Sequence, residues 1–484
     1  MKNEYDPQLI ASQIEGYLTE HDLYYGDKPR DNGDASWTLA LNTHEVTERQ
    51  ELFLGTDVPE LIHSFHHGSA SLLRNALNPS TRNLSPSLQQ LNRYITAGVP
   101  DETIALWIEA AKKGERVFSS RPDMIIDANG DFTVIEYNAD GGADKGNTQG
   151  VNDYSRQFLG KEVIGANLAQ LFVRQISQRH GGKGVIQVAT ILPDDYRNEY
   201  DSQNRYFARI ASEIGKRRGI TWRTARLSDI RYGEDVVYLE EDGNRIVLDV
   251  VDREFKLPGF SKGKSFESEV ALVRASLHGK VDMLGSVLPL SDKILLSTLF
   301  DPAYGTVFDR QQDLQDLHAP TGVVDSTSSL VRIGSEQFTI DDVAQLKPEF
   351  QMVLKRGGDT DGSTGSKGLV ISEDVHLDSW KRALESALTE PLDGGSYWVI
   401  QRFQESARFP VSHIRNSRSK PKELMVINRF APYYVATPQG MELGNILVTA
   451  GTDEETVKKR RNNIHGLRQN TYQAVSAPIA SKVA

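Results

Sequence analysis

The segment "RPDMIIDANGDFTVIEYNADGG" (Arg121–Gly142) contains two apolar, strand-forming runs on either side of a turn. Its Asn-Gly pair is among the strongest short-range signals for a hairpin. Because alternate residues of a strand share a face, Glu136 and Asn138 point to one side, and Asp123 on the preceding strand comes alongside them. Arg121, two residues before Asp123, belongs to the same face. The segment therefore predicts a hairpin with one strongly polar face.

The polar face of this hairpin has the composition of a magnesium site. Carboxylate and amide oxygens are the protein ligands that Mg²⁺ prefers, and water and phosphate oxygens complete its coordination. We interpret Asp123, Glu136 and Asn138 as metal ligands, and we expect Arg121 to stabilise charge on a transferring phosphoryl group. A surface hairpin with solvated acids is the alternative, although it does not explain an acid within the apolar run "VIEYN". The loop that follows, 138–150, is a candidate for contacts with substrate.

A second candidate site is the glycine-rich segment "GGDTDGSTGSKG" (Gly357–Gly368), which follows Lys355. The apolar runs "QMVLK" and "GLVI" bracket it, so a hairpin is predicted. Bare glycine N–H groups can approach phosphate closely, and Lys355 could reach the same phosphate oxygens. A P-loop is excluded because Ser363 stands where its lysine must be, and the kinase and Rossmann fingerprints are absent. A nucleotide lid and an ordinary surface hairpin both remain open.

The positions of this segment that we expect to contact phosphate are Gly357, Gly358, Gly362, Ser363, Gly365 and Gly368. Asp359 and Asp361 would repel phosphate unless they turn away or face a metal ion. The sequence predicts no role for these two acids.

The chain of 484 residues is too long for one ordinary core, so two to four packed units are expected. The first 120 residues read mostly as helices, with apolar residues at helical spacing in Val58–Leu77 and Asp101–Phe118. From Gly182 onward, strand and helix patterns alternate as in a parallel α/β unit, and the run "RIVLDVVDREF" (245–255) reads as one strand. "LPLSDKILLSTLF" (Leu288–Phe300) reads as a helix. The expected fold class is mixed α/β.

These segments together resemble the ATP-grasp fold in its glutathionylspermidine synthase-like branch. R-x-D, a turn and "VIEYNAD" look like the metal-binding segment of that family. "LPLSDKILLSTLF" is similar to the helix with the first nucleotide-binding lysine, here Lys293, and "MVLKRGGDTDGSTGSKGLVI" resembles the second lysine, Lys355, with its lid. "YWVIQRF" resembles the hinge strand whose backbone reads the adenine edge, here Gln401, Arg402 and Phe403.

The order of these motifs is similar to that of the circularly permuted members of the family. The E-x-N strand comes at position 136 and the glycine-rich segment at 357, whereas ordinary ATP-grasp enzymes have the opposite order. The resemblance implies a circularly permuted ATP-grasp fold with an inserted Rossmann-like pre-ATP-grasp α/β domain. "LDVVDREF" (Leu248–Phe255) resembles a strand of that domain that ends at the active site, with Asp249 and Arg253 as weaker candidates.

The resemblance also implies domain boundaries. Residues 1–180 would hold a helical region and the metal-binding half of the ATP-grasp domain, and 181–287 the pre-ATP-grasp domain. Residues 288–404 would form the lid subdomain with glycine-rich loop and hinge, and 405–484 would return to the core with a polar tail. In this last part the candidates for binding an acidic substrate or phosphate are Arg408, Arg415, Arg418 and Arg429, and a structural use is an equal alternative for each.

The activity implied by the resemblance is that of an ATP-dependent carboxylate–amine ligase. A substrate carboxylate would attack the γ-phosphate of ATP to give an acylphosphate and ADP, and an amine would then displace phosphate. ATP and Mg²⁺, with two ions expected, are the implied cofactors, and a small carboxylic acid and a small amine are the implied substrates. A phosphotransferase and a non-catalytic nucleotide-binding protein are the alternatives. The complete Asp-Glu-Asn-Arg set and the two lysines argue against the latter.

The composition excludes several other classes of function. The formal net charge of -11 argues against a nucleic-acid binder, which normally presents a basic face. No stretch approaches the roughly 20 apolar residues of a membrane helix, and "MKNEYDPQLIASQIEG" lacks the apolar core of a signal peptide. The absence of cysteine excludes disulfides, thiolate zinc sites and a cysteine nucleophile. We expect a cytoplasmic enzyme without nucleic-acid or membrane partners, and a homodimer is the default expectation because symmetric dimers are common.

Overall fold

The computed structural model describes residues 7–21, 23, 38–40, 45–114, 117–139, 144–158, 163–194, 198–254, 265–328, 330–345, 351–358, 368–414, 420, 422–452, 474–476 and 479–480. The predictions for the following residues lie outside the described part of the chain: Asp359, Asp361, Gly362, Ser363, Gly365, Arg415 and Arg418.

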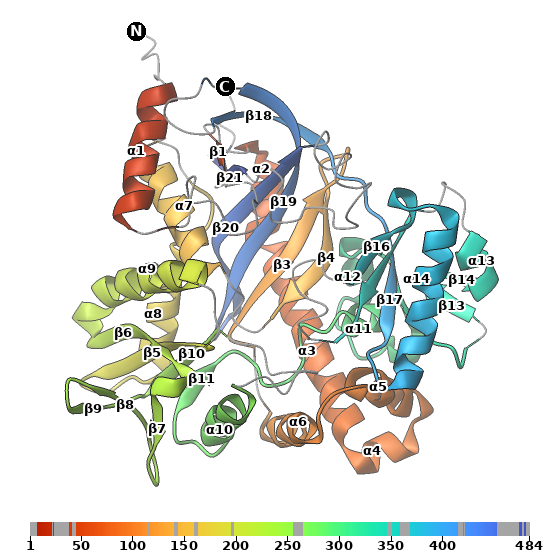
Figure 1. Ribbon diagram of the computed structural model, residues 1–484, viewed down its shortest axis with the longest axis horizontal. Helices are drawn as coiled ribbons and strands as arrows, with labels where there is room; N and C mark the ends of the chain where they lie inside the picture. The colour runs from red at the N-terminus through yellow and green to blue at the C-terminus, as the bar shows by residue number, and fades with distance from the viewer. Residues whose placement is uncertain are drawn as a thin grey trace.

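Among the described residues, the largest sheet has seven strands in the order β18-β1-β21-β20-β19-β3-β4. Their bounds are Arg408–Ile414 (β18), Thr38–Ala40 (β1), Ala474–Ser476 (β21), Gly440–Thr452 (β20), Lys422–Thr437 (β19), Ser119–Ile126 (β3) and Phe132–Asn138 (β4). β1 and β21 run parallel, and the other neighbours run antiparallel. Figure 1 shows the long blue strands β19 and β20 beside the orange hairpin β3–β4, so segments far apart in the chain form one central sheet. The predicted hairpin is confirmed.

One face of this hairpin packs on helix α3 (Asp57–Leu77). Tyr137, in the middle of the "EYN" motif, is buried, and its ring stacks on Phe65 of α3 with 4.5 Å between centroids. The Tyr137 hydroxyl lies 2.8 Å from Nε2 of the buried His318. Burial lowers the pKa of His318 to about 4, so this imidazole is neutral near pH 7. The period of two along β4 therefore separates a buried aromatic face from the polar face.

A parallel sheet in the order β11-β10-β5-β6 lies at the lower left of Figure 1. Its strands are Ile186–Leu192 (β5), Ile220–Arg226 (β6), Val250–Arg253 (β10) and Asp282–Leu284 (β11). The helices of this region are Leu168–Arg179 (α8), Asn198–Gly215 (α9) and Phe266–Leu277 (α10), and the nearby strand Val237–Glu241 (β8) belongs to an antiparallel sheet. Phe172 of α8 and Phe207 of α9 pack against Trp222 of β6 in its core. The predicted alternation of strand, helix and strand is confirmed.

The prediction of one strand over 245–255 is wrong. The run forms two strands, because β9 (Asn244–Val247) pairs antiparallel with β8, and β10 enters the parallel sheet. Between them, the carboxylate of Asp249 accepts a hydrogen bond from the backbone N–H of Gln187 at 2.8 Å. This bond fixes the chain at the start of β10, and a run of apolar residues gives no signal for it.

A third sheet, in the order β12-β17-β15-β16, lies on the right of Figure 1 beside the β3–β4 hairpin. Its strands are Thr321–Val324 (β12), Met352–Arg356 (β15), Leu369–Ile371 (β16) and Trp398–Arg402 (β17), and the helices Ile340–Gln345 (α13) and Leu377–Thr389 (α14) share its core. The pairing of β15 with β16 places Lys355 opposite Leu369. The predicted hairpin around the glycine-rich segment is confirmed.

The helix predicted over Leu288–Phe300 is shorter than expected. Helix α11 comprises Ile294–Thr298, so Lys293 directly precedes it. The carboxylate of Asp292 accepts a hydrogen bond from the N–H of Ile294 at 3.0 Å and satisfies one of the free donors at the helix start. Lys293 therefore extends from the beginning of a short helix, not from the middle of a long one.

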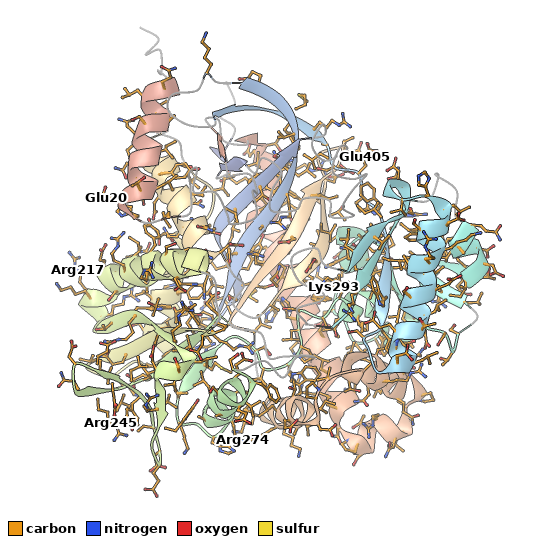
Figure 2. All side chains as sticks on the ribbon, in the orientation of Figure 1. Glu20, Arg217, Arg245, Arg274, Lys293 and Glu405 are labelled. Carbon is orange, nitrogen blue, oxygen red and sulfur yellow. The ribbon has the colours of Figure 1, made fainter. Side chains whose placement is uncertain are left out.

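The remaining elements are Pro7–Glu20 (α1), Glu45–Val46 (β2), Glu48–Gly55 (α2), Pro79–Leu84 (α4), Pro86–Thr96 (α5), Asp101–Lys113 (α6), Lys145–Phe158 (α7), Ile230–Tyr232 (β7), Gln311–Leu317 (α12), Leu330–Ile333 (β13), Glu336–Thr339 (β14) and Ile479–Ala480 (β22). Among the described residues, no helix combines the length and apolar character that a membrane span requires. Figure 2 shows Lys293 between the central sheet and the third sheet, and it is buried there.

Candidate active site

The polar face of the β3–β4 hairpin has the predicted arrangement. Arg121 lies opposite Asn138, and Asp123 lies opposite Glu136, so the register confirms that the four residues share one face. The register shifts directly after the second pair, because Met124 pairs with Val134 and leaves Ile135 as a bulge. The bulge frees the carbonyl oxygen of Ile135 for contacts with another element.

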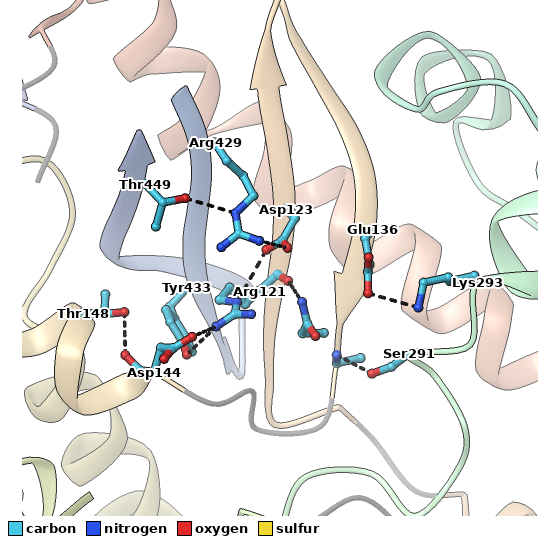
Figure 3. A network of polar contacts seen from close by, with 12 residues as sticks. Arg121, Asp123, Glu136, Asp144, Thr148, Ser291, Lys293, Arg429, Tyr433 and Thr449 are labelled. Carbon is cyan, nitrogen blue, oxygen red and sulfur yellow. Dashed lines mark hydrogen bonds and ion pairs between the residues drawn. The ribbon is translucent and has the colours of Figure 1, made fainter. Parts of the chain in front are cut away.

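The acids on this face are paired with basic groups from three elements, as Figure 3 shows. Lys293 Nζ lies 3.2 Å from Glu136 Oε1, and Arg429 Nη1 of β19 lies 3.1 Å from Asp123 Oδ2. Arg121 Nε lies 3.7 Å from Asp123 Oδ1. Burial alone would lower the pKa of Arg121, but Tyr433, Asp123 and Asp144 raise it, so the guanidinium keeps its charge.

The three predicted metal ligands fit a magnesium ion by their chemistry. Asp123 Oδ1 is buried and accepts no hydrogen bond from the described residues. Asn138 Nδ2 donates to the carbonyl oxygen of Arg121 at 3.5 Å, so its Oδ1 lies on the other side of the amide. The Glu136 side chain is 31% exposed and can turn toward a ligand. Two carboxylates and one amide oxygen form a hard oxygen set that suits Mg²⁺.

The third sheet reaches this face through Lys355 and Gln401. Lys355 Nζ donates to the freed carbonyl oxygen of Ile135 at 3.0 Å, and Gln401 Nε2 lies 3.4 Å from the same oxygen. Gln401 Nε2 also donates to Thr321 Oγ1 at 2.9 Å. The bulge therefore joins the central sheet to the third sheet at the level of the acidic pair.

The described residues give the charge of Lys355 no direct ion pair. In the part of the chain that the structure describes, no carboxylate lies within 4.0 Å of its ammonium group. Burial lowers its pKa to about 8, with Lys293 acting in the same direction and Glu136 and Asp123 opposing the change. A buried ammonium group whose described partner is a carbonyl oxygen has the charge and the remaining N–H donors to bind an anion.

The ends of the glycine-rich segment are fixed by backbone contacts. The N–H of Gly357 donates to the carbonyl oxygen of Tyr397 at 2.9 Å, and a Cβ at Gly357 would lie 2.7 Å from that oxygen. Gly358 has a φ of 77° and donates its N–H to Asp292 Oδ1 at 3.0 Å. Gly368 has a φ of 66°. Close approach and left-handed backbone explain glycine at these three positions, and Asp292 places the segment beside Lys293.

The predicted hinge strand uses its backbone donors within the protein. The N–H of Arg402 donates to the carbonyl oxygen of Pro320, and the N–H of Phe403 donates to that of Gln351. The Arg402 side chain forms an ion pair with Glu336 at 3.0 Å. A nucleotide base would therefore receive no hydrogen bond from either N–H in this conformation.

The weaker candidates lie in two places, at the two ends of β10 and on strands β18 and β19 of the central sheet. Asp249 lies at the start of β10 and pairs with Lys183 at 2.7 Å, away from the polar face. Arg253, at the carboxyl end, donates to the carbonyl oxygen of Ser286 at 2.7 Å. Arg408 stands opposite Ile427 in the β18–β19 register, whereas Arg429 reaches Asp123.

A second charged cluster beside the polar face was not predicted. Arg121 Nη1 lies 3.2 Å from Asp144 Oδ2, and the next residue, Lys145, lies 2.7 Å from Asp252 and 2.6 Å from Glu254. Asp252 and Glu254 alternate along "VVDREF", so they share a face of that strand. This alternation was the available signal. The sequence prediction named Asp249 and Arg253 on this strand and did not include Asp252 and Glu254.

No protein-family model and no curated protein matches the sequence. Among solved structures, a glutathione synthetase-like effector of Globodera pallida in its apo form is similar to this chain, with a TM-score of 0.58 and 12% sequence identity over 99% of this chain and 98% of that one. The chain has a glutathione synthetase-like fold. A Methylobacillus flagellatus KT protein provisionally named a gamma-glutamylcysteine synthetase covers 85% of this chain and 87% of its own at 13% identity, but its TM-score of 0.37 supports no conclusion. At such identities the likeness concerns the fold alone.

Proposed function

We propose that the protein is an ATP-dependent ligase that joins a small carboxylic acid to a small amine and releases ADP and phosphate. One observation carries the proposal: two lysines from separate segments meet over the acidic strand β4. Lys293 contacts Glu136, and Lys355 contacts the neighbouring carbonyl of Ile135, with no carboxylate partner among the residues that the structure describes. Two cations beside a set of metal-binding oxygens suit a nucleotide triphosphate with its metal. The glutathione synthetase-like fold agrees with this activity.

We further propose that the fold is a circularly permuted ATP-grasp fold. The acidic hairpin precedes both lysines in the chain, and the parallel sheet lies between the hairpin and Lys293 in sequence. The parallel sheet would then be the inserted pre-ATP-grasp domain, and the third sheet the lid subdomain. The boundaries at 180, 287 and 404 belong to this proposal.

The residues of the site have distinct tasks in the proposed reaction. Lys293 and Lys355 bind phosphate oxygens of ATP, and Asp123, Glu136 and Asn138 would hold Mg²⁺. The ion, when bound, neutralises negative charge on the phosphate oxygens. A substrate carboxylate then attacks the γ-phosphate, ADP leaves, and the amine attacks the acyl carbon of the acylphosphate and displaces phosphate.

Arg121 is the group that we assign to charge stabilisation during transfer. Its guanidinium is buried, charged and held beside the metal-binding oxygens, so it meets the transferred phosphoryl group without reorganisation. The protein needs no covalent nucleophile for this chemistry, since it acts by position and charge. The glycine-rich segment Gly357–Gly368 stays a predicted cover for the phosphates.

The proposal is tested by a screen for ADP release over pairs of carboxylic acids and amines, with mass spectrometry of the products. The expected result is ADP, free phosphate and an amide in equal amounts for at least one pair. AMP and pyrophosphate would show acyl-adenylate chemistry and contradict the proposal. ADP without free phosphate, together with a phosphorylated product, would show a phosphotransferase.

A further inference from the structure

A buried cluster of three charged side chains lies next to the proposed active site and has no task in the reaction above. Lys145 begins helix α7, and its ammonium group lies 2.7 Å from both carboxylate oxygens of Asp252 and 2.6 Å from Glu254 Oε1. The side chain of Lys145 has no exposed surface, and those of the two acids are 1% and 2% exposed. The rings of Phe172 and Phe207 lie 5.6 and 5.9 Å from the ammonium group. The cluster is thus enclosed by aromatic side chains.

Stability alone does not explain this cluster. Removing an ion from water costs several kcal/mol, and apolar replacements of a buried ion pair are often as stable as the pair itself. Here two carboxylates share one ammonium group. Burial raises the pKa of Glu254 to about 8, with Asp252 and Asp144 acting in the same direction and Lys145 opposing the change. Glu254 therefore mostly holds its proton near pH 7, and burying this carboxyl group together with the Lys145–Asp252 ion pair is a costly way to fill a core.

The cluster is connected to Arg121 through one residue. Asp144, directly before Lys145, has a φ of 82°, which is rare for a residue other than glycine. Its carbonyl oxygen accepts hydrogen bonds from both the N–H and the hydroxyl of Thr148, at 2.8 and 2.7 Å. Its carboxylate holds Arg121 Nη1 at 3.2 Å. The conformation of Asp144 therefore depends on where the first turn of α7 is anchored.

The first turn of α7 has almost no freedom to shift. A Cβ at Gly146 would lie 1.8 Å from the carbonyl oxygen of Gln203 on α9, so the two helix backbones touch. On the other side, Lys145 ties the turn to the carboxyl end of β10 through Asp252 and Glu254. Figure 3 shows Asp144 at the start of α7 with its side chain directed toward Arg121 and Tyr433.

We propose that Lys145, Asp252 and Glu254 form a positioning cluster, which anchors the first turn of α7 on the parallel sheet and so holds Asp144 against Arg121. The guanidinium of Arg121 then stays directed at the transferred phosphoryl group. The role of Arg121 in phosphoryl transfer rests on the proposed ligase function. The series of contacts from the positioning cluster through Asp144 to Arg121 does not depend on that function. Through this link, the parallel sheet contributes to the orientation of Arg121.

The first test removes all three charges together, so that no buried charge is left unpaired. The variant is Lys145→Met with Asp252→Asn and Glu254→Met, in which the amide oxygen introduced at position 252 keeps an acceptor for the hydroxyl of Thr190. We expect kcat for ADP formation to fall roughly 10- to 100-fold, as when groups that orient an active residue are removed, with an unchanged KM for ATP and an unchanged melting temperature. An unchanged kcat in a folded variant would overturn the proposal.

A matched control removes an ion pair between strand β6 of the same parallel sheet and the neighbouring antiparallel strand β8, away from Arg121. Arg223 of β6 pairs with Glu241 at 2.7 Å. The double variant Arg223→Gln with Glu241→Gln should keep native kcat. A loss equal to that of the triple variant would show that any charge change in this sheet lowers kcat, and it would overturn the specific link to Arg121.

A second variant guards against failure of the triple variant to fold. Asp144→Ala cuts the link and leaves the cluster intact, and the Asp144 side chain is 29% exposed, so the fold should persist. We expect the same selective loss of kcat, and no additional loss when this change is combined with the triple variant. Native kcat in Asp144→Ala would overturn the proposal.

A crystal structure of the triple variant separates this inference from the proposed function. We expect the distance between Arg121 Nη1 and Asp144 Oδ2 to exceed hydrogen-bond reach, about 3.5 Å. Retention of the native contact would overturn the inference. If the native protein forms no ADP with any substrate pair, the proposed function fails, and this structure alone still decides the inference.

Discussion

The surroundings of Lys355 and Lys145 differ although both lysines are buried, at 6% and 1% exposure. Lys355 stands between the central and third sheets with a carbonyl oxygen as its partner, and burial lowers its pKa to about 8. Lys145 stands between two carboxylates, which raise its pKa against the effect of burial. Lys355 thus lacks a direct anion among the described residues, whereas Lys145 contacts two acidic side chains.

This difference indicates that the two lysines serve different purposes: Lys355 is suited to binding a ligand, and Lys145 is suited to stabilising the fold. A buried ammonium without a carboxylate is favourable only when an anion arrives from outside, so the Lys355 region is suited to phosphate. An ammonium enclosed by carboxylates has nothing left to offer a ligand, so the Lys145 region is suited to fixing structure. Equivalent substitutions in the two regions should therefore change different properties.

The largest expected effect is on stability, in Lys145→Met. This single change leaves Asp252 and Glu254 buried without a cation, which should cost about 3–5 kcal/mol in the free energy of unfolding. Urea titration followed by circular dichroism measures it. Lys355→Met is the matched control and should lose little or no stability, because it removes a buried charge that has no direct anion in the described part of the chain. Equal losses in the two variants would remove the distinction between the regions.

The next effect is on turnover, in Glu136→Gln. This change removes a carboxylate from the proposed metal site and should lower ADP formation by about 10²- to 10³-fold while the fold persists. Asp131→Asn, at the exposed turn of the same hairpin, is the control and should keep the native rate. Near-normal turnover in Glu136→Gln would show that the metal assignment is wrong.

A smaller effect is expected on nucleotide affinity, in Lys355→Met. A charge-assisted hydrogen bond contributes roughly 1.5–3 kcal/mol, so the dissociation constant for the magnesium complex of ADP should rise about 10- to 100-fold. Titration calorimetry gives this value without knowledge of the substrates. The charge-retaining variant Lys355→Arg should bind more tightly than Lys355→Met, and equal affinities of the native protein and Lys355→Met would place the nucleotide elsewhere.

The smallest effect is on pH dependence. Because the pKa of Lys355 lies at about 8, half of the free protein has lost this positive charge at that pH, and most of it has at pH 9. Nucleotide affinity should then fall by up to about tenfold per pH unit, whereas Lys355→Arg stays charged and should show no such fall. The contribution of Lys355 to the free energy of unfolding changes with pH in the opposite direction. Because the unfolded chain holds the proton up to about pH 10.5, this group makes stability rise between pH 8 and 10.5. Calorimetry at pH 7, 8 and 9 checks the affinity.

Much of the polar face could be predicted because its causes are local. The Asn-Gly turn predicts the hairpin, and the alternation along "VIEYN" puts Glu136 and Asn138 on one face, whereas Asp123 comes opposite Glu136 only because Ile135 forms a bulge. The hairpin of β15 and β16 also follows from apolar runs around a glycine-rich segment. The approach of Lys293 and Lys355 to this face came only from resemblance to a family, since no local pattern connects residues more than 150 positions apart.

The rest depends on contacts that no periodic pattern reveals. The bulge at Ile135 exposes the carbonyl oxygen that Lys355 and Gln401 bind, and a one-residue shift in register has no signal in the residues themselves. The pairing of Lys145 with Asp252 joins the start of helix α7 to strand β10 of the parallel sheet. Helix α11 begins only at Ile294, where Asp292 Oδ1 accepts the backbone N–H of Ile294, and the spacing of apolar residues does not reveal this start.

The most direct test of the central claim is a crystal structure of the protein with magnesium and a non-hydrolysable ATP analogue. We predict that the phosphates lie between β15 and β4, that Lys355 Nζ leaves the carbonyl oxygen of Ile135 for a phosphate oxygen, and that the metal contacts Asp123, Glu136 and Asn138. A nucleotide bound elsewhere, with Lys355 still on that carbonyl, would contradict the account.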